Sequence, residues 1–299
     1  MLFSEHQHLL VTVTVLTVLI AFSLVLYAYL KRKINTSAFI GTLMLGVVIL
    51  VAFRLKFGYA GMLVLLAFFL FGNLVTKYKY DKKAKLGVAE GNKGMRDINN
   101  VLGNGLSPLI FALLFAVSSQ SHNTIFLLGF SGAVATACAD TFSTEIGQAE
   151  GNPRLITTLK KVPVGTNGGV SLPGLGASLL GSGLISLVGF AFWFDLQMSS
   201  RTILLLSCVC LLSGFLGCIV DSFLGATVED KPFYKKRLRK NASQQTLEKF
   251  DQQTFKKSLI KNATPASQFR LNKHGVNVLA TLFGGIFAIL LGYSLGIQI

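Results

Sequence analysis

The residues Ala139-Asp140-Thr141-Phe142-Ser143-Thr144-Glu145-Ile146-Gly147 follow directly on an apolar run, 125–139, and join a hydrophobic segment to a group of oxygen-bearing side chains. The run predicts a helix that lies in the hydrocarbon of a bilayer. Asp140 and Glu145 stand five residues apart among hydroxyls, and such oxygens are the ligands that a hard divalent cation prefers. The stretch therefore predicts a membrane-embedded fold with a polar site at the membrane boundary.

The composition of the whole chain supports a membrane protein. Of its 299 residues 52% are hydrophobic and only 14% are charged, against about 25% charged residues in soluble domains. Several apolar runs reach the roughly 20 residues that span a bilayer, and they lack the alternation of barrel strands. The runs are 9–30, 38–53, 58–76, 105–119, 124–140, 172–194, 203–221 and 275–297.

We therefore predict an all-α, polytopic helical membrane protein with about eight transmembrane helices, formed by residues 1–299 as a single integral membrane domain. The runs 38–53 and 105–119 are short enough to be tilted, buried or partly re-entrant. The N-terminus lacks the basic segment and cleavage site of a signal peptide, so the first run is expected to remain as a span. Cys138, Cys208, Cys210 and Cys218 lie inside apolar runs without CxxC spacing, which favours packing roles over zinc or disulfides.

The basic residues indicate the orientation in the membrane. All but three of the 28 Lys and Arg residues, the exceptions being Arg54, Lys56 and Arg201, fall in the connections after the first, third, fifth and seventh runs. The positive-inside rule then places these connections in the cytoplasm and both termini outside. The net charge of +15 is explained by topology, so nucleic acid is not expected as a partner.

A basic insert, 228–273, is predicted between the seventh and eighth spans. Four apolar residues at approximately helical spacing within it predict an amphipathic helix on the membrane surface, and the surrounding basic residues favour attraction to anionic lipids. These apolar residues are Leu247, Phe250, Phe255 and Leu259.

A glycine-rich turn follows the aspartate motif. It reads Lys160-Lys161-Val162-Pro163-Val164-Gly165-Thr166-Asn167-Gly168-Gly169-Val170-Ser171. Glycines let backbone N–H groups approach phosphate oxygens, and lysines neutralise their charge. Many glycine pairs merely reverse the chain, and the sequence has no Walker A motif. The position of the turn between Asp140 and the next span is what favours a phosphate-binding role.

A polar stripe precedes the fourth span. Arg96, Asn100 and Asn104 are spaced so that a helix would place all three on one face. Polar side chains entering a membrane helix are costly and usually functional. The alternative interpretation is an ordinary interfacial helix end with one snorkelling arginine.

Two short patterns recur along the chain. Asp-Thr-Phe at 140–142 returns as Asp-Ser-Phe at 221–223, and Asn-Val-Leu at 100–102 returns at 277–279. They suggest two related halves that each offer an aspartate to a shared Mg²⁺ site, although matches this short also arise by chance.

These motifs resemble those of the membrane family that includes transmembrane protein 19 and the plant and cyanobacterial phytyl-phosphate kinases. The resemblance covers roughly residues 30–298 and includes the stretches 96–105, 140–147, 153–158, 164–171 and 221–227. Gly103 and Phe142 stand where the family commonly has Ala and Trp. Membership would imply a CTP-dependent kinase that converts a prenyl monophosphate, of the phytyl or geranylgeranyl type, to its diphosphate.

The expected roles follow from this resemblance together with the residue types. Mg²⁺ would be held by Asp140 and Asp221, with Glu145 as a third carboxylate, although Glu145 could equally be a solvated loop charge. Transfer to an anionic phosphate needs positioning and charge neutralisation rather than a general base. Nucleotide phosphates would contact Lys160, Arg154, Gly165, Thr166, Asn167, Gly168 and Gly169, and the acceptor phosphate would contact Arg96, Asn100 and Asn104.

Three other functions fit parts of the pattern. A transporter or flippase of a phosphorylated lipid would use the same cations without chemistry, but would place polar groups near the middle of the bilayer. A CTP-dependent transferase would form a CDP-lipid and release pyrophosphate. A purely structural membrane protein would not need so many polar groups at span ends. Because both aspartates end apolar runs, the sequence favours the kinase, and it leaves the prenyl length and the oligomeric state open.

Overall fold

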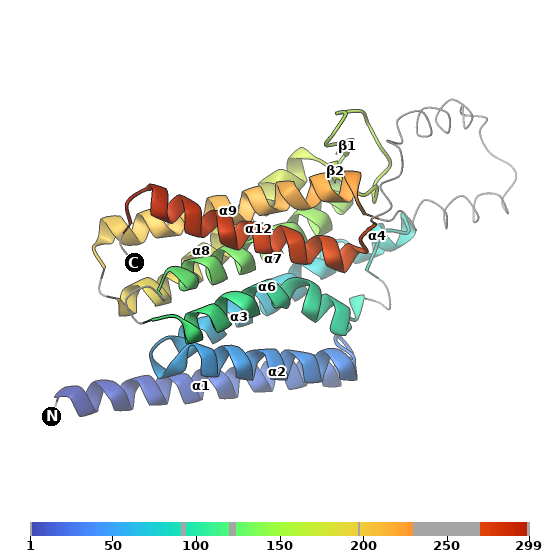
Figure 1. Cartoon of the computed structure of the whole chain (residues 1–299). Helices are drawn as coiled ribbons and strands as arrows, with labels where there is room; N and C mark the ends of the chain where they lie inside the picture. Colours follow the sequence, from blue (N-terminus) through green and yellow to red (C-terminus); the bar gives the residue numbers. More distant parts are fainter. Residues whose placement is uncertain (1, 91–93, 120–123, 197, 230–269, 298–299) are drawn as a thin grey trace, which may run out of the picture.

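The fold is described from a computed structural model, which covers residues 2–90, 94–119, 124–196, 198–229 and 270–297 (Figure 1). Eight long apolar helices make up most of these residues, and seven of them are long and apolar enough to cross a membrane. This confirms the predicted all-α, multi-span fold. The long helices are α1 (Leu2–Leu30), α2 (Thr36–Ala52), α3 (Arg54–Lys77), α6 (Ile98–Val117), α7 (Ile125–Glu150), α8 (Leu172–Asp195), α9 (Ser200–Thr227) and α12 (Lys273–Ser294).

Successive long helices run in opposite directions, so the connections gather at the two ends of the bundle. Figure 1 shows both chain termini at one end and, at the other, the short helix α4 (Tyr80–Lys85) and the strands β1 (Arg154–Leu155) and β2 (Gly169–Val170). All of the polar motifs therefore belong to the end of the bundle opposite the termini. We refer to it as the motif end.

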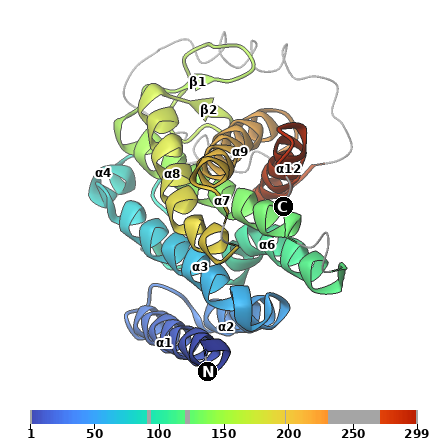
Figure 2. The same cartoon turned by 90° about the vertical axis from the view of Figure 1, so that its left-hand side faces the viewer.

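Helix α7 forms the centre of the bundle and contacts α3, α6, α8, α9 and α12 (Figure 2). Its sequence between residues 129 and 139 consists largely of small side chains, which let neighbouring backbones approach closely. A Cβ atom at Gly132 would lie 2.7 Å from Ala288 Cβ and 2.8 Å from the Gly284 carbonyl oxygen of α12. Close packing of α7 against its neighbours thus fixes the positions of the polar side chains farther along the helix.

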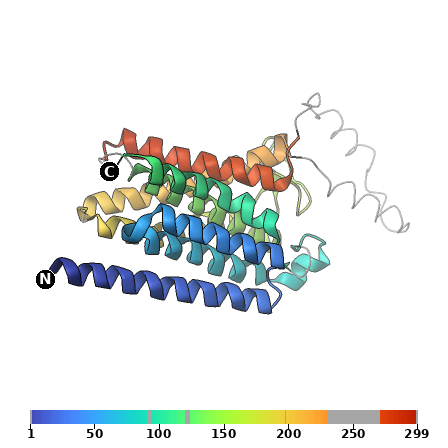
Figure 3. The same cartoon turned by 60° about the horizontal axis from the view of Figure 1, so that its bottom comes forward.

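Aromatic side chains fill the bundle near the end that carries the termini. The Phe53 ring at the α2–α3 corner makes edge-to-face contacts with the rings of Phe130 and Phe192, at centroid distances of 4.9 and 5.6 Å. Such pairs add to the stabilisation gained from burial. Helix α1 lies on the outer edge of the bundle against α2 and α3 (Figure 3).

Of the two spans predicted to be short, one is longer in the structure and the other is short, as expected. The run 105–119 was expected to be short, but α6 begins at Ile98 because Asp97 caps it: the Asp97 carboxylate accepts from the Asn100 backbone N–H, and the Asn100 side chain accepts from the Asp97 N–H. The 17-residue α2 is short, as predicted from the run 38–53.

The expectation that both aspartates stand at helix ends was wrong. Helix α7 continues for ten residues beyond Asp140, about 15 Å along its axis, and α9 continues for six residues beyond Asp221. The apolar run stops at Asp140, whereas the helix does not, because the next polar side chains are accommodated inside the bundle. The Thr141 hydroxyl, for example, is buried and donates to the Ala137 carbonyl oxygen at 2.8 Å.

The predicted basic insert 228–273 lies mostly outside the described residues, and so does its expected amphipathic helix. Its two described ends meet: the Leu271 backbone N–H donates to the Val228 carbonyl oxygen at 3.1 Å, and Glu229 and Leu271 form a parallel bridge. The insert therefore leaves and re-enters the bundle at one place, between α9 and α12.

Candidate functional site

A polar cavity of about 190 Å³ lies at the motif end, where α7, α9, α12 and the connection from β1 to β2 come together. The residues that line it belong to segments far apart in the sequence, and most are polar residues or glycines. They include Asp140, Ser143, Thr144, Gly147, Gly165, Thr166, Asn167, Gly168, Gly169, Asp221, Ser222, Gly225, Glu229, Lys273 and Asn277. We call this space the polar cavity.

Asp140 and Asp221 face one another in the polar cavity, with their carboxyl groups close enough to interact directly. Thr144, one turn after Asp140, places its hydroxyl 3.5 Å from Asp140 Oδ1. Asp221 Oδ2 is buried and has no hydrogen-bond partner among the described residues. A buried carboxylate oxygen without a partner is costly, and two adjacent carboxylates favour binding of a cation.

The donor set fits Mg²⁺. Within the described ranges no group of three or more His, Cys, Asp or Glu side chains is arranged as a complete metal site. Mg²⁺ is typically bound by one or two carboxylates together with waters and substrate phosphates, which is the pattern that Asp140 and Asp221 provide. Glu229 lines the same cavity and adds a third negative charge near Asp221.

The glycine-rich turn is held directly against α9. Gly165 and Gly168 have φ angles of +84° and +73°, which glycine adopts without strain. A Cβ atom at Gly168 would lie 2.4 Å from Ala226 Cβ and 2.7 Å from the Ala226 backbone nitrogen, so no larger residue fits there. The turn thus approaches α9 one turn beyond Asp221, and Thr166 and Asn167 line the polar cavity.

Lys273 brings a positive charge to the polar cavity. From the sequence, this residue was counted only among the basic residues that indicate membrane orientation. It is the first residue of α12, with Asn277 four residues later lining the same cavity. Its Nζ lies 3.5 Å from Glu90 Oε2, and its charge acts on Asp140 and Asp221. The charges of Lys273 and then Arg96 hold the pKa of Glu90 below its usual value. In the sequence, the recurring Asn-Val-Leu at 277–279 was the signal that could have pointed to the start of α12 as part of the site.

Three residues that were expected to bind the nucleotide or the metal do not line the polar cavity. Lys160 is exposed in the connection between β1 and β2, and the exposed Arg154 guanidinium donates to the Leu159 carbonyl oxygen at 2.9 Å. Glu145 is buried and forms an ion pair with the fully buried Lys83. The structure thus gives Glu145 a partner from α4 and places Glu229, which sequence reasoning missed, beside the aspartates.

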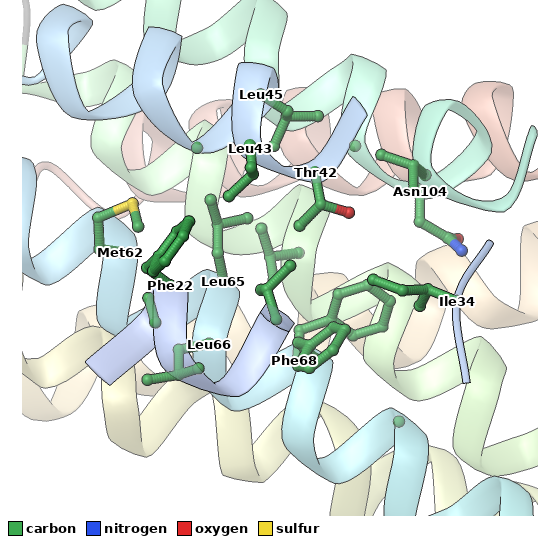
Figure 4. A pocket seen from close by; sticks show the side chains of 18 of the residues that line it. Phe22, Ile34, Thr42, Leu43, Leu45, Met62, Leu65, Leu66, Phe68 and Asn104 are labelled. Atoms are coloured by element: carbon green, nitrogen blue, oxygen red, sulfur yellow. The ribbon is translucent and has the colours of Figure 1, made fainter. Parts of the chain in front are cut away.

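A second cavity, of about 230 Å³, lies between α1, α2, α3 and α6 and is lined mainly by apolar side chains (Figure 4). We call it the apolar cavity. Arg96, Asn100 and Asn104 all line it, as their common spacing suggested. Arg96 itself precedes α6, so the predicted continuous helical face was wrong for this residue. Its backbone pairs with Ile34, and its guanidinium donates to Thr76 Oγ1 at 3.1 Å.

A pair of amides connects the two cavities. The buried Asn277 of the polar cavity donates from Nδ2 to Oδ1 of the buried Asn104 of the apolar cavity, at 3.2 Å. One turn deeper, Thr281 donates to Ser107 Oγ at 2.9 Å and continues the contact between α6 and α12. The helices that carry the two Asn-Val-Leu patterns therefore pack against one another, as do α7 and α9 with their aspartates. Whether the halves are related by a repeat stays a prediction.

Together the fold and the two cavities define a multi-pass integral membrane protein with a buried polar site at one end of its helical bundle. Comparison with protein families matches residues 19–285 to the family described as "Integral membrane protein DUF92". The chain belongs to this family, and the resemblance drawn from its motifs is confirmed.

Similar proteins come from plants, archaea and cyanobacteria. The chain is 36% identical over 182 residues to "Protein VTE6, chloroplastic" from Arabidopsis thaliana, which is 60% of this chain and 53% of that protein. It thus spans about half the length of that relative. Identity to the "Uncharacterized membrane protein MJ0933" of Methanocaldococcus jannaschii is 29% over 92% of both chains. Identity to "Protein PGR" of Arabidopsis thaliana is 30% over 77% of this chain and 82% of that protein. No solved structure matches.

Proposed function

We propose that this protein is a CTP-dependent kinase that phosphorylates a prenyl monophosphate to the diphosphate at the cytoplasmic end of the bundle. The observation that carries the proposal is the contact between Asn104 and Asn277, which joins a carboxylate-bearing polar cavity to an apolar cavity. A lipid phosphate in one cavity and a nucleotide in the other would meet at this contact. The choice of CTP and of a prenyl phosphate rests on the resemblance to the phytyl-phosphate kinases.

The polar cavity suits the triphosphate of the nucleotide. Asp140 and Asp221 would hold Mg²⁺, which when bound neutralises charge on the phosphate oxygens. Lys273 adds a positive charge at the start of α12, where backbone N–H groups also favour anions. The backbone of the glycine turn, with Thr166, would hold the remaining phosphate oxygens. In this proposal Glu145 is not a metal ligand, Glu229 contributes a nearby negative charge, and Lys273 replaces Lys160 as the principal cation.

The end of the apolar cavity near Arg96 suits the acceptor phosphate. Arg96 is positioned from both sides, by the backbone of Lys33 and by Thr76, and its guanidinium would pair with phosphate oxygens. An oxygen of the prenyl phosphate attacks the terminal phosphorus of CTP, the bond from that phosphorus to the bridging oxygen breaks, and CDP leaves. The attacking oxygen is already anionic, so the residues need only position it and neutralise charge.

The orientation is part of the proposal. The motif end carries the basic connections, and the positive-inside rule assigns these to the cytoplasm, where CTP is available. Anionic lipids are the proposed partners of the basic insert.

A lipid-phosphate carrier remains the second candidate, because Asp140 lies about 15 Å inside the end of α7, deeper than the sequence indicated. Carriers place ionisable groups within the membrane. Transport would require that the polar cavity open alternately to both ends of the bundle, without change to the lipid or the nucleotide.

Product analysis tests the proposal and separates its rivals. Purified protein in lipid nanodiscs is incubated with Mg²⁺, CTP and geranylgeranyl or phytyl phosphate, and products are identified by mass spectrometry. We expect prenyl diphosphate and CDP, with at least a hundredfold loss of rate in Asp140→Asn. Release of pyrophosphate with a CDP-lipid would instead identify a transferase, and absence of turnover from folded protein would favour the carrier.

A further inference from the structure

The apolar cavity has one polar end and one hydrocarbon end. In Figure 4, Asn104 lies at one end, and Phe22 and Met62 lie at the other. The lining residues of α3 run from Met62 to Asn73, which corresponds to about 16 Å along the helix axis. The cavity therefore extends from the polar end toward the interior of the membrane, roughly parallel to α3.

Toward the hydrocarbon end of the cavity, α2 and α3 approach one another. Gly46 of α2 and Met62 of α3 both line it. A Cβ atom at Gly46 would lie 3.7 Å from Met62 Cε and 3.8 Å from its sulfur, which is ordinary van der Waals contact. The Met62 thioether thus lies against Gly46, with room for a Cβ atom but not for a larger side chain without displacement of Met62. Because Met is flexible, it makes an adjustable boundary.

The side of the cavity is open toward the surroundings of the bundle. Phe22 of α1 and Val47 of α2 line the cavity and are 45% and 58% exposed. Helix α1 is fastened to α2 near their junction by a separate cluster of Val25, Ala28, Ile34 and Ala38. Nearer the N-terminus, α1 presents exposed Leu and Val side chains, so a lipid chain can approach between α1 and α2 from the bilayer.

We propose that the apolar cavity holds the hydrocarbon tail of the acceptor, that the tail enters sideways past Phe22 and Val47, and that Met62 together with Gly46 limits its length. The inference rests on the proposed function and specifies where the tail of its lipid substrate binds and which residues limit the tail length. The matching features are one continuous apolar wall and one polar end, at which Arg96 supplies a cation and Asn100 and Asn104 supply amides.

Chain-length preference tests this assignment. Rates are measured in nanodiscs with geranyl, farnesyl and geranylgeranyl phosphate for wild-type protein, Gly46→Leu and Met62→Ala. Gly46→Leu shortens the cavity and should lower the ratio of kcat/KM for geranylgeranyl over farnesyl phosphate by about tenfold or more, whereas Met62→Ala should raise it. A general loss of folded protein does not move this ratio. Met44→Ala is the matched control, since Met44 is 64% exposed on α2 and does not line the cavity. Unchanged ratios in both cavity variants would overturn the inference.

A second readout does not depend on turnover. Farnesyl phosphate with a photoreactive diazirine at the end of its tail is cross-linked to wild-type protein, and the labelled peptides are mapped. We expect label on the peptides that contain Phe22 or Met62, and its loss when excess geranylgeranyl phosphate is added. Label on α8 or α9, or label that competitor does not displace, would overturn the tail assignment. Label at Met62 from a protein without kinase activity would support the tail assignment and contradict the proposed function.

Discussion

At the scale of single residues, charge placement distinguishes this site from an ordinary helix end. Asp140 and Asp221 bring two carboxylates together, and Lys273 stands at the rim of the same cavity, paired with Glu90. Lys273 is half exposed, so its pairing with Glu90 contributes little to stability. The Nζ group can therefore leave Glu90 and bind a phosphate with only a small loss of free energy.

Replacement of Lys273 should impair catalysis more than folding. Lys273→Ala removes a cation from the polar cavity and should lower kcat/KM for CTP by about 10²- to 10³-fold, in line with the loss of one group that stabilises a transition-state charge. Lys273→Arg keeps the charge and should retain part of the rate. Steady-state kinetics in nanodiscs measure the effect, and the thermal unfolding midpoint should stay close to that of wild type.

Lys160→Ala is the control for this experiment, because Lys160 was expected at the site from sequence and is exposed in the structure. Its rate should stay near that of wild type. A larger loss in Lys160→Ala than in Lys273→Ala would contradict the assignment of the nucleotide-binding cation.

At the scale of elements, the sequence predicted the long helices, but not how far they extend. Apolar runs identified all eight long helices because hydrophobic length is a direct requirement for spanning a bilayer. The polar continuation of α7 beyond Asp140 could not be recognised, because burial of hydroxyls and carboxylates depends on neighbours that only the fold supplies. The pairing of Glu145 with Lys83 is such a case.

The Lys83–Glu145 pair fastens the short helix α4 onto the central helix α7. Lys83 is fully buried, and its Nζ also donates to the Thr76 carbonyl oxygen at 2.9 Å, while the Thr76 hydroxyl accepts from Arg96. The pair therefore connects α4 and α7 with the end of α3 that supports Arg96. We interpret Glu145 as a structural residue rather than a metal ligand.

Removal of one partner of this pair should destabilise the protein strongly. Glu145→Gln leaves the Lys83 charge buried without a counter-ion and should lower the free energy of unfolding by about 3–5 kcal/mol. The double variant Glu145→Leu, Lys83→Met should recover most of this loss and, since neither residue lines the polar cavity, should keep its Mg²⁺-dependent activity. Denaturant titration and turnover measure the two effects.

Lys79→Met provides the comparison, because Lys79 forms a solvent-exposed ion pair with Glu150, the last residue of α7. Its loss should change the free energy of unfolding only slightly. If the double variant were stable but had lost its dependence on Mg²⁺, Glu145 would be a metal ligand after all.

At the scale of the whole molecule, the aspartates, the glycine turn, Lys273 and Arg96 come from segments up to 177 positions apart and all meet at the motif end. The sequence indicated this gathering through the alternation of basic and neutral connections, because an even number of spans returns every motif to the same side. It could not show that the Arg96 side and the Asp140 side form two cavities, since the Asn104–Asn277 contact depends on the packing of α6 against α12. Because this contact brings the two cavities together, we predict direct transfer between two bound substrates.

The most direct test of this arrangement is to follow the label from CTP carrying ³²P at either the α or the γ position, with and without prenyl phosphate. We predict that γ-label appears in the prenyl diphosphate, that α-label appears in CDP, and that neither labelled protein nor exchange between CTP and CDP is found without the prenyl phosphate. Label on the protein, exchange without acceptor, or α-label in the lipid would contradict direct transfer at the contact between Asn104 and Asn277.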